Sequence, residues 1–204
     1  MKESAKTVTF INHTQTYSSS SKRVLDVGGG DGSRGRQHFP EASITVLDLK
    51  NGWDVMKMGL PYGDWDVLFM NHVIEHVSDP DFLLDEAYKV MGPDTVLEIG
   101  TPNLAAWFNR ILFLFGYVPH SVELSKRYGL GKAFNWDDEP LGGHVYVYTV
   151  PAIVKLLKLH GFKNIEVVGE ASTYPCNPVI GLIDKTLTKL SPTFASAVRI
   201  RCTI

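Results

Sequence analysis

A glycine-rich turn directly behind a short apolar run limits the fold of this chain more than any other feature. Residues 24–27 read Val-Leu-Asp-Val, and five of the next eight residues are glycines. A short apolar run that ends in glycines indicates a buried strand. The segment 33–39 can then form a short helix with Ser33 as its N-cap. A strand, a glycine-rich turn and a helix in this order are typical of α/β folds that bind a nucleotide at the turn.

Strand and helix patterns alternate along most of the chain. Two predicted helices share their start signals, since Asp79 and Thr149 can serve as N-caps and a proline follows each of them closely. The predicted helices span 78–94 and 149–162, and the predicted strands span 22–28, 43–49, 65–71, 95–101, 163–170 and 196–204. This alternation predicts an α/β fold with a doubly wound, mostly parallel sheet that helices cover on both faces.

The length of 204 residues suits a single domain over residues 1–204. Residues 1–22 are expected to lead into the first long strand. Residues 102–146 interrupt the alternation of strands and helices and are expected to form a lid or substrate insertion. The net charge of −2 gives no electrostatic footprint for nucleic acid. The sequence predicts no particular oligomeric state.

Cysteine use and hydropathy indicate where the protein is expected to reside. Cys176 and Cys202 lie far apart and form no CxxC pair, which argues against a disulfide framework and fits a reducing compartment. The first residues lack the apolar core of a signal peptide. The most apolar stretch, 104–118, is interrupted by Asn109 and Arg110 and is too short to span a bilayer. We therefore expect a cytoplasmic protein without stable membrane insertion.

The residues around the glycines distinguish between two classes of ligand. Gly30, Gly32 and Gly35 have the GxGxxG spacing of dinucleotide-binding turns, but Asp26 and a second acid in the loop would repel a pyrophosphate. The same carboxylates would attract an ammonium or sulfonium group. Asp48 ends the next predicted strand, where a carboxylate can accept both hydroxyls of a ribose. These features indicate S-adenosylmethionine as the ligand, and the alternative is a tight turn beside an unrelated surface acid.

Five segments resemble the class I, Rossmann-like, S-adenosylmethionine-dependent methyltransferases. They are VLDVGGGDGS (24–33), VLDL (46–49), LPYGDWDVLFMNHVIEHVSDP (60–80), VLEIGTPN (96–103) and GGHVYVYTVPAIVKLLKLHGFKNIEVVG (142–169). The EHV and GH features point to the small-molecule branch, which includes ubiquinone-biosynthesis O-methyltransferases. The resemblance implies a Rossmann-like fold that closes with a C-terminal antiparallel hairpin strand.

The resemblance also implies roles for individual residues at the cofactor. Asp26 would support the loop or the ammonium group of the cofactor, and Asp48 would hold its ribose. Only 17 residues separate Asp48 from Asp66, where the family usually has a helix and another strand. Asp54 is the candidate for the acid on the adenine side of this shortened segment. The implied cofactor-binding residues are Asp26, Gly28, Gly30, Gly32, Asp48, Leu49, Asp54, Val55, Asn71 and His72.

The acceptor side of the site is less clearly marked. His144 matches the Gly-His of the family and is the candidate for a catalytic base or a substrate-orienting group. A hydrogen-bonded structural histidine is the alternative reading. His76, Trp107 and Tyr117 are candidates for substrate binding, the last two because the aromatic residues of 102–146 can shape an apolar pocket.

Three other function classes compete with methyl transfer. HVIEH, residues 72–76, has the HxxEH spacing of zinc hydrolases, but a strand precedes it and a new helix start follows within one turn, so no metal is predicted. An NAD(P)-dependent oxidoreductase and a non-catalytic S-adenosylmethionine-binding protein are the others. The sequence therefore predicts methyl transfer to a small-molecule or lipid-linked acceptor, with oxygen as the favoured accepting atom.

Overall fold

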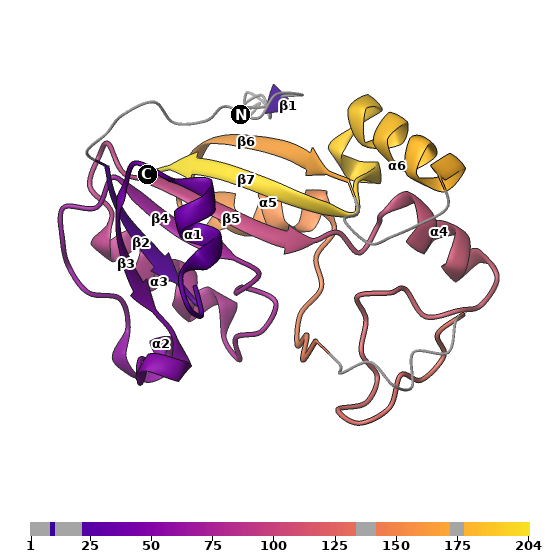
Figure 1. Cartoon of the computed structure of the whole chain (residues 1–204), viewed down its shortest axis with the longest axis horizontal. Coiled ribbons are helices and arrows are strands. Elements are labelled where there is room, and N and C mark those ends of the chain that lie inside the picture. The colour runs from indigo at the N-terminus through magenta and orange to yellow at the C-terminus, as the bar shows by residue number, and fades with distance from the viewer. Residues whose placement is uncertain (1–8, 11–21, 134–141, 172–177) are drawn as a thin grey trace, which may run out of the picture.

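The computed structural model describes residues 9–10, 22–133, 142–171 and 178–204. It confirms the predicted α/β fold, with a seven-stranded sheet in the order β1-β6-β7-β5-β4-β2-β3 (Figure 1). The strands are β1 (Thr9–Phe10), β2 (Arg23–Val27), β3 (Ser43–Leu47), β4 (Val67–Asn71), β5 (Val96–Pro102), β6 (Lys163–Glu170) and β7 (Ala197–Thr203). Strands β2 to β5 are parallel, whereas β7 runs antiparallel to both β5 and β6.

Helices cover both faces of the sheet, as the alternation predicts. The helices α3 (Pro80–Val90) and α5 (Val150–Leu159) join the larger hydrophobic cluster with the inward side chains of β2, β4 and β5. The helix α1 (Ser33–His38) lies over the opposite face, where Phe39 packs in a smaller cluster. Each large apolar side chain that is fully buried in this way contributes about 1.5–3 kcal/mol.

Two of the three predicted helix caps are confirmed. The Asp79 side chain accepts the backbone N–H of Phe82 at 2.9 Å, and the Thr149 side chain accepts that of Ala152 at 3.4 Å. Ser33 differs from the prediction because it is the first helical residue. Gly32 takes the N-cap position in the left-handed region, and no side chain caps α1.

The connection between β3 and β4 is as short as the sequence indicates. It contains a 3-10 helix, η1 (Leu49–Asn51), and the single-turn helix α2 (Val55–Met58). Residues 48–66 are all described, and none of them forms a strand. Strand β3 therefore ends the sheet on this side.

The C-terminal strand β7 is antiparallel to its neighbours, as the resemblance implies, but no tight hairpin turn joins it to β6. The helix α6 (Pro178–Leu190) and the 3-10 helix η2 (Pro192–Phe194) lie between β6 and β7, so these strands are antiparallel neighbours without a tight turn. The helix α4 (Trp107–Leu114) follows β5 and lies at the same end of the molecule as α6 (Figure 1). Among the residues described, no helix is both long and apolar enough to span a membrane.

Candidate active site

The loop between β2 and α1 turns on three glycines in the left-handed region. Gly28, Gly30 and Gly32 have φ angles of 69°, 60° and 75°. Residues with a side chain rarely adopt such angles, whereas glycine adopts them readily. A Cβ atom on Gly28 would lie 2.6 Å from a methyl group of Val73, whereas a Cβ on Gly30 would meet no atom within 4 Å. The loop is therefore tightly packed at its start and open above Gly30, where a ligand can approach the backbone.

Asp48 lies beside this open part of the loop, at the end of β3. One carboxylate oxygen accepts the N–H of Gly30 at 2.8 Å, and the other accepts the N–H of Lys50 at 2.8 Å. An ionised carboxylate has about four acceptor positions, so it keeps capacity for two hydroxyl donors. The side chain is half-buried and lies where the spacing in the sequence predicts a ribose-binding acid.

Asp26 lies beneath the loop rather than on its surface. A Cβ atom on Gly29 or Gly35 would overlap its carboxylate, so both glycines are required by close packing. The side chain is 1% exposed, and its Oδ2 has no hydrogen-bond partner among the described residues. Burial raises the pKa of Asp26 to about 6. The positive charge of Arg36 lowers this pKa, and the negative charge of Asp48 raises it.

These observations fit S-adenosylmethionine as the ligand of the loop. The space above Gly30 admits a ligand at the backbone. Asp48 offers acceptors for ribose hydroxyls. The Asp26 carboxylate packs under Gly29 and Gly35, and its negative charge beneath the loop would attract the ammonium group of the cofactor's methionine portion. Asp26, Gly30 and Asp48 are thus the residues that would hold it.

The turn that follows β4 contacts the glycine loop through Val73 and forms its own polar cluster. The Nδ1 atom of His72 lies 2.9 Å from Glu75 Oε1, and the Thr101 hydroxyl donates to Glu75 Oε2 at 3.1 Å. The backbone carbonyl of Glu75 accepts the N–H of Val145 at 2.8 Å. Residues 72–76 therefore connect the cofactor loop to the segment that carries His144.

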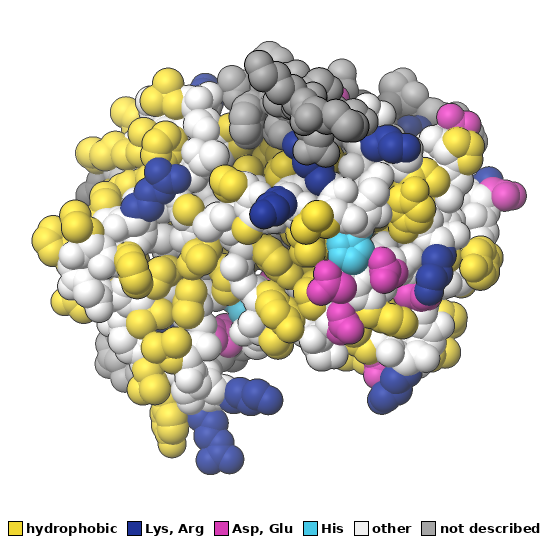
Figure 2. All heavy atoms as spheres, turned by 180° about the vertical axis from the view of Figure 1, so that it is seen from behind, with side chains coloured by type: hydrophobic (Ala, Val, Ile, Leu, Met, Phe, Trp, Pro, Cys, Tyr) yellow, Lys and Arg dark blue, Asp and Glu magenta, His cyan; other side chains and the backbone are white. Residues whose placement is uncertain are grey.

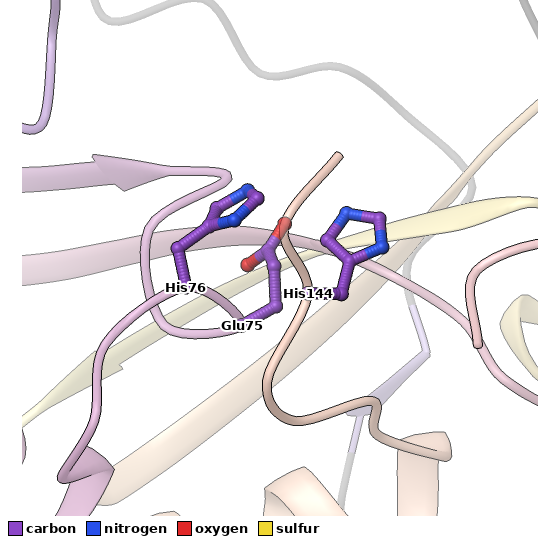
Figure 3. A group of neighbouring side chains, drawn as sticks. All are labelled: Glu75, His76 and His144. Carbon is purple, nitrogen blue, oxygen red and sulfur yellow. The ribbon is translucent and has the colours of Figure 1, made fainter. Parts of the chain in front are cut away.

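This turn is not the helix that an HxxEH zinc motif requires. His72 pairs with Glu75, while the ring of His76 lies 4.9 Å from that of His144. Figure 3 shows the Glu75 carboxylate between the two rings. One ligand atom from each of Glu75, His76 and His144 lies within 4.8 Å of the others, a donor set that a divalent cation accepts, although both Glu75 oxygens already take part in hydrogen bonds.

The remaining predicted site residues have varied surroundings. Leu49 is 74% exposed beside Asp48. Asp54 caps α2 and pairs with a lysine one turn later, while Val55 packs against the main core. Asn71 ends β4 and lies against Gly100 of β5.

The two aromatic candidates for substrate binding lie on and after α4. The indole N–H of Trp107 donates to Asp184 of α6 at 2.7 Å, which holds the ring against α6. Tyr117 is 44% exposed.

The partners of His144 were not predicted from the sequence. Its Nδ1 atom donates to the carbonyl oxygen of Ser121 at 2.9 Å and lies 3.7 Å from a carboxylate oxygen of Glu123. That carboxylate also accepts the N–H of Gly143, at 2.9 Å. A backbone carbonyl leaves no trace in the sequence, and Glu123 lies in a segment without a recognisable pattern.

Comparison with known proteins identifies the family. The model of a methyltransferase domain family matches residues 5–167, and no curated protein sequence matches the chain. Among solved structures, an S-adenosylmethionine-dependent methyltransferase from Mesorhizobium loti has a TM-score of 0.54 at 15% identity, covering 89% of this chain and 90% of that one. A second, from Archaeoglobus fulgidus, has a TM-score of 0.53 at 15% identity, covering 90% and 86%. The mitomycin 7-O-methyltransferase MmcR has a TM-score of 0.53 at 17% identity, with 92% of this chain spanning 50% of MmcR.

These structures share the fold of the chain, and the family model covers most of its length. S-adenosylmethionine is the methyl donor of the family that the sequence resembles, and the glycine loop with Asp26 and Asp48 fits it. The chain therefore belongs to the class I S-adenosylmethionine-dependent methyltransferases.

Proposed function

We propose that this methyltransferase transfers a methyl group to a hydroxyl oxygen of a small-molecule or lipid-linked acceptor, with His144 as the residue that handles the proton. S-adenosylmethionine supplies, when bound, a methyl group activated by its sulfonium sulfur. The observation that carries the proposal is the turn at 72–76, because it contacts the glycine loop through Val73 and the His144 segment through Glu75. The solved structure named for an oxygen-directed methyl transfer, MmcR, has the same fold.

The hydrogen bonds of the two imidazoles support this role. A carbonyl oxygen only accepts, so the bond from His144 to Ser121 requires the proton on Nδ1. The Nε2 atom of the neutral ring then has a lone pair that can accept a hydroxyl proton. The carboxylate of Glu123 stabilises the ring once it is charged. His76 donates from Nδ1 to Gly143 in the same way, which leaves its Nε2 to orient the acceptor.

Methyl transfer is an in-line displacement, so the chain must above all hold the acceptor oxygen in position. The two imidazole rings lie 4.9 Å apart and each presents an Nε2 acceptor atom, so they can accept protons from two hydroxyl groups of one acceptor molecule. This arrangement supports an acceptor that carries at least one hydroxyl group, because both rings would present acceptor atoms to it.

Replacing His144 by alanine is expected to lower turnover by about 10²–10⁴-fold, the usual contribution of a general base. The affinity for S-adenosylhomocysteine should remain within about twofold, because His144 acts on the acceptor. The measurement is the release of S-adenosylhomocysteine in the presence of a panel of hydroxylated acceptors. His160→Gln is the matched control, since this histidine bonds to Asp81 and Asp85.

Unchanged turnover in His144→Ala would remove that residue from the proposed mechanism. Binding of the cofactor without turnover on any acceptor would favour the non-catalytic alternative. Zinc titration tests the donor set of Glu75, His76 and His144. Stoichiometric zinc binding that His144→Ala abolishes, together with loss of turnover on chelation, would make the metal rather than the imidazole the acting group.

The affinity for S-adenosylhomocysteine is expected to rise as the pH rises through about 6, where Asp26 ionises. Only the ionised carboxylate attracts the ammonium group, so binding lowers the pKa of Asp26 and releases a proton below this pH. Asp26→Asn keeps the shape and should remove this pH dependence. Calorimetric titrations between about pH 5 and pH 8 measure both proteins. The same pH dependence in Asp26→Asn would assign it to another group.

A further inference from the structure

We propose that α4 and α6 together form a surface that binds anionic lipid bilayers peripherally. The first observation is that α6 has an inverted pattern of burial. The residues that α6 buries are polar, Asp184 and Thr188. Its exposed large apolar residues are Val179, Ile180, Leu182, Ile183 and Leu190. Positions 179, 182, 183 and 190 follow the spacing of one helix face, so an apolar stripe runs along the outer side of the helix.

The helix α4 has the same inverted pattern. Its one buried residue is Asn109. Ile111, Phe113 and Leu114 are exposed, and Phe115 directly behind the helix is 71% exposed. We call these four residues and the five apolar residues of α6 the α4–α6 surface. Figure 2 shows hydrophobic side chains gathered along the left edge of that view, the end of the molecule where Figure 1 places both helices.

Inward hydrogen bonds fix this orientation. Asp184 Oδ1 accepts the indole N–H of Trp107 at 2.7 Å and the hydroxyl of Ser196 at 3.3 Å. Asn109 donates to the carbonyl of Asn103 at 3.3 Å and accepts the N–H of His120 at 2.9 Å. Rotating either helix to bury its apolar side would leave these polar groups without their partners. These hydrogen bonds keep the apolar side chains on the outer side of both helices, and an exposed apolar patch of this kind marks an interaction site.

The charges around the surface select an anionic partner. The exposed charged side chains of α4 and α6 are all cationic: Arg110, Lys185 and Lys189. The one acid of these two helices, Asp184, is turned inward, where it accepts the indole N–H of Trp107. The chain as a whole has a net charge of −2, so the positive charge of these two helices differs in sign from that of the chain. Asp137, Asp138 and Glu139 of the sequence lie outside the described residues.

An apolar stripe flanked by lysines is the pattern of a helix that lies in a membrane interface. The lysines extend to the headgroups while the apolar side chains enter the acyl boundary. A second copy of the chain fits less well, because a two-fold contact brings the same surface patch of both copies together. One interface would then hold the lysines of both α6 helices, with no exposed acid among the described residues of α4 and α6.

The surface is also connected to the proposed acceptor site. Asn109 of α4 binds the backbone of His120, and the next residue, Ser121, binds the ring of His144. A bilayer bound at α4 would thus lie along the segment that holds the proposed base. If the proposed function holds, this position favours a lipid-linked acceptor. The proposal that the surface binds a bilayer does not depend on the proposed function.

Co-sedimentation with vesicles tests the proposal. Vesicles of phosphatidylcholine with about one third phosphatidylglycerol should bind the protein, and salt should weaken binding by screening. The double variant Leu114→Gln/Leu182→Gln should bind at least about tenfold more weakly, since two exposed leucines no longer enter the bilayer. Lys185→Glu/Lys189→Glu should lose the preference for anionic over pure phosphatidylcholine vesicles. Leu159→Gln, at an equally exposed leucine of α5, is the matched control and should bind normally.

Two results would overturn the proposal. One is binding that neither double variant changes. The other is no binding to any vesicle. Dimerisation in sedimentation analysis that Leu114→Gln/Leu182→Gln abolishes would in that case assign the surface to a second copy. Titration with S-adenosylhomocysteine on the same variants keeps the two proposals separate, because the surface is remote from Asp48 and its loss should leave cofactor binding unchanged.

Discussion

Replacing Asp48 by alanine is expected to weaken S-adenosylhomocysteine binding by about 10- to 100-fold, the range for lost hydrogen bonds to a charged group. The variant removes the carboxylate that lies beside the open part of the glycine loop. It also removes the bond to the N–H of Gly30, which helps to fix the loop. Calorimetric titration of wild type and variant measures the effect. Asp64→Ala is the control, at an acid whose side chain is 87% exposed.

The stability of Asp48→Ala has to be measured in parallel. Asp48 caps η1 through the N–H of Lys50, and loss of such a cap costs about 1 kcal/mol. Asp48→Asn keeps an acceptor oxygen and should bind with intermediate affinity. Equal affinity of Asp48→Ala and wild type, with both proteins folded, would contradict the assignment of Asp48 to the ribose.

Removing the carboxylate of Glu98 is expected to give the largest loss of stability in the chain. Glu98 lies on β5 with no exposed surface. Arg201 donates to its Oε2 at 2.8 Å, while His38 Nε2 and Arg199 Nε lie 2.7 Å and 3.5 Å from its Oε1. Glu98→Ala leaves Arg199 and Arg201 without their shared carboxylate. Breaking a buried ion pair by removal of one partner costs about 3–5 kcal/mol.

The pH dependence of this effect gives a second test. Desolvation raises the pKa of Glu98, but the His38 ring and the charge of Arg201 outweigh it, so the pKa lies below the ordinary value of 4.5. A lowered pKa stabilises the fold above the pKa of the unfolded chain, and this stability is lost as the pH falls. The difference in the free energy of unfolding between wild type and Glu98→Ala should therefore be largest at neutral pH and shrink below about pH 4.5.

Urea unfolding at several pH values measures both quantities. Glu170→Ala is the matched control, because this acid also pairs with Arg199 but is partly exposed, and exposed pairs contribute about 0–1 kcal/mol. A loss of less than about 1 kcal/mol in Glu98→Ala would contradict a structural role for the cluster.

Much of the fold and of the cofactor side could be predicted because the signals are local. Asp79 and Thr149 cap helices as predicted, since a cap depends on residues within one turn. Asp48 lies beside Gly30 because adjacent parallel strands bring their carboxyl ends to one edge of the sheet. Ser33 was predicted as a cap, but the left-handed glycine before it takes that position.

The acceptor side and the α4–α6 surface depend on contacts between distant segments. His144 is held by a backbone carbonyl 23 residues away, which no side-chain pattern indicates. The segment 104–118 carries one cation, Arg110, and therefore gave no sign of a basic membrane surface. The lysines of that surface come from α6, which tertiary packing brings against α4 through Trp107 and Asp184.

The most direct measurement is a calorimetric titration of the unmodified protein with S-adenosylhomocysteine and, separately, with NAD⁺. The account predicts one S-adenosylhomocysteine bound per chain and no heat from NAD⁺, because Asp26 and the second acid of the loop suit an ammonium group but repel a pyrophosphate. Binding of NAD⁺ with no response to S-adenosylhomocysteine would contradict the methyltransferase assignment and indicate that the glycine loop binds a dinucleotide.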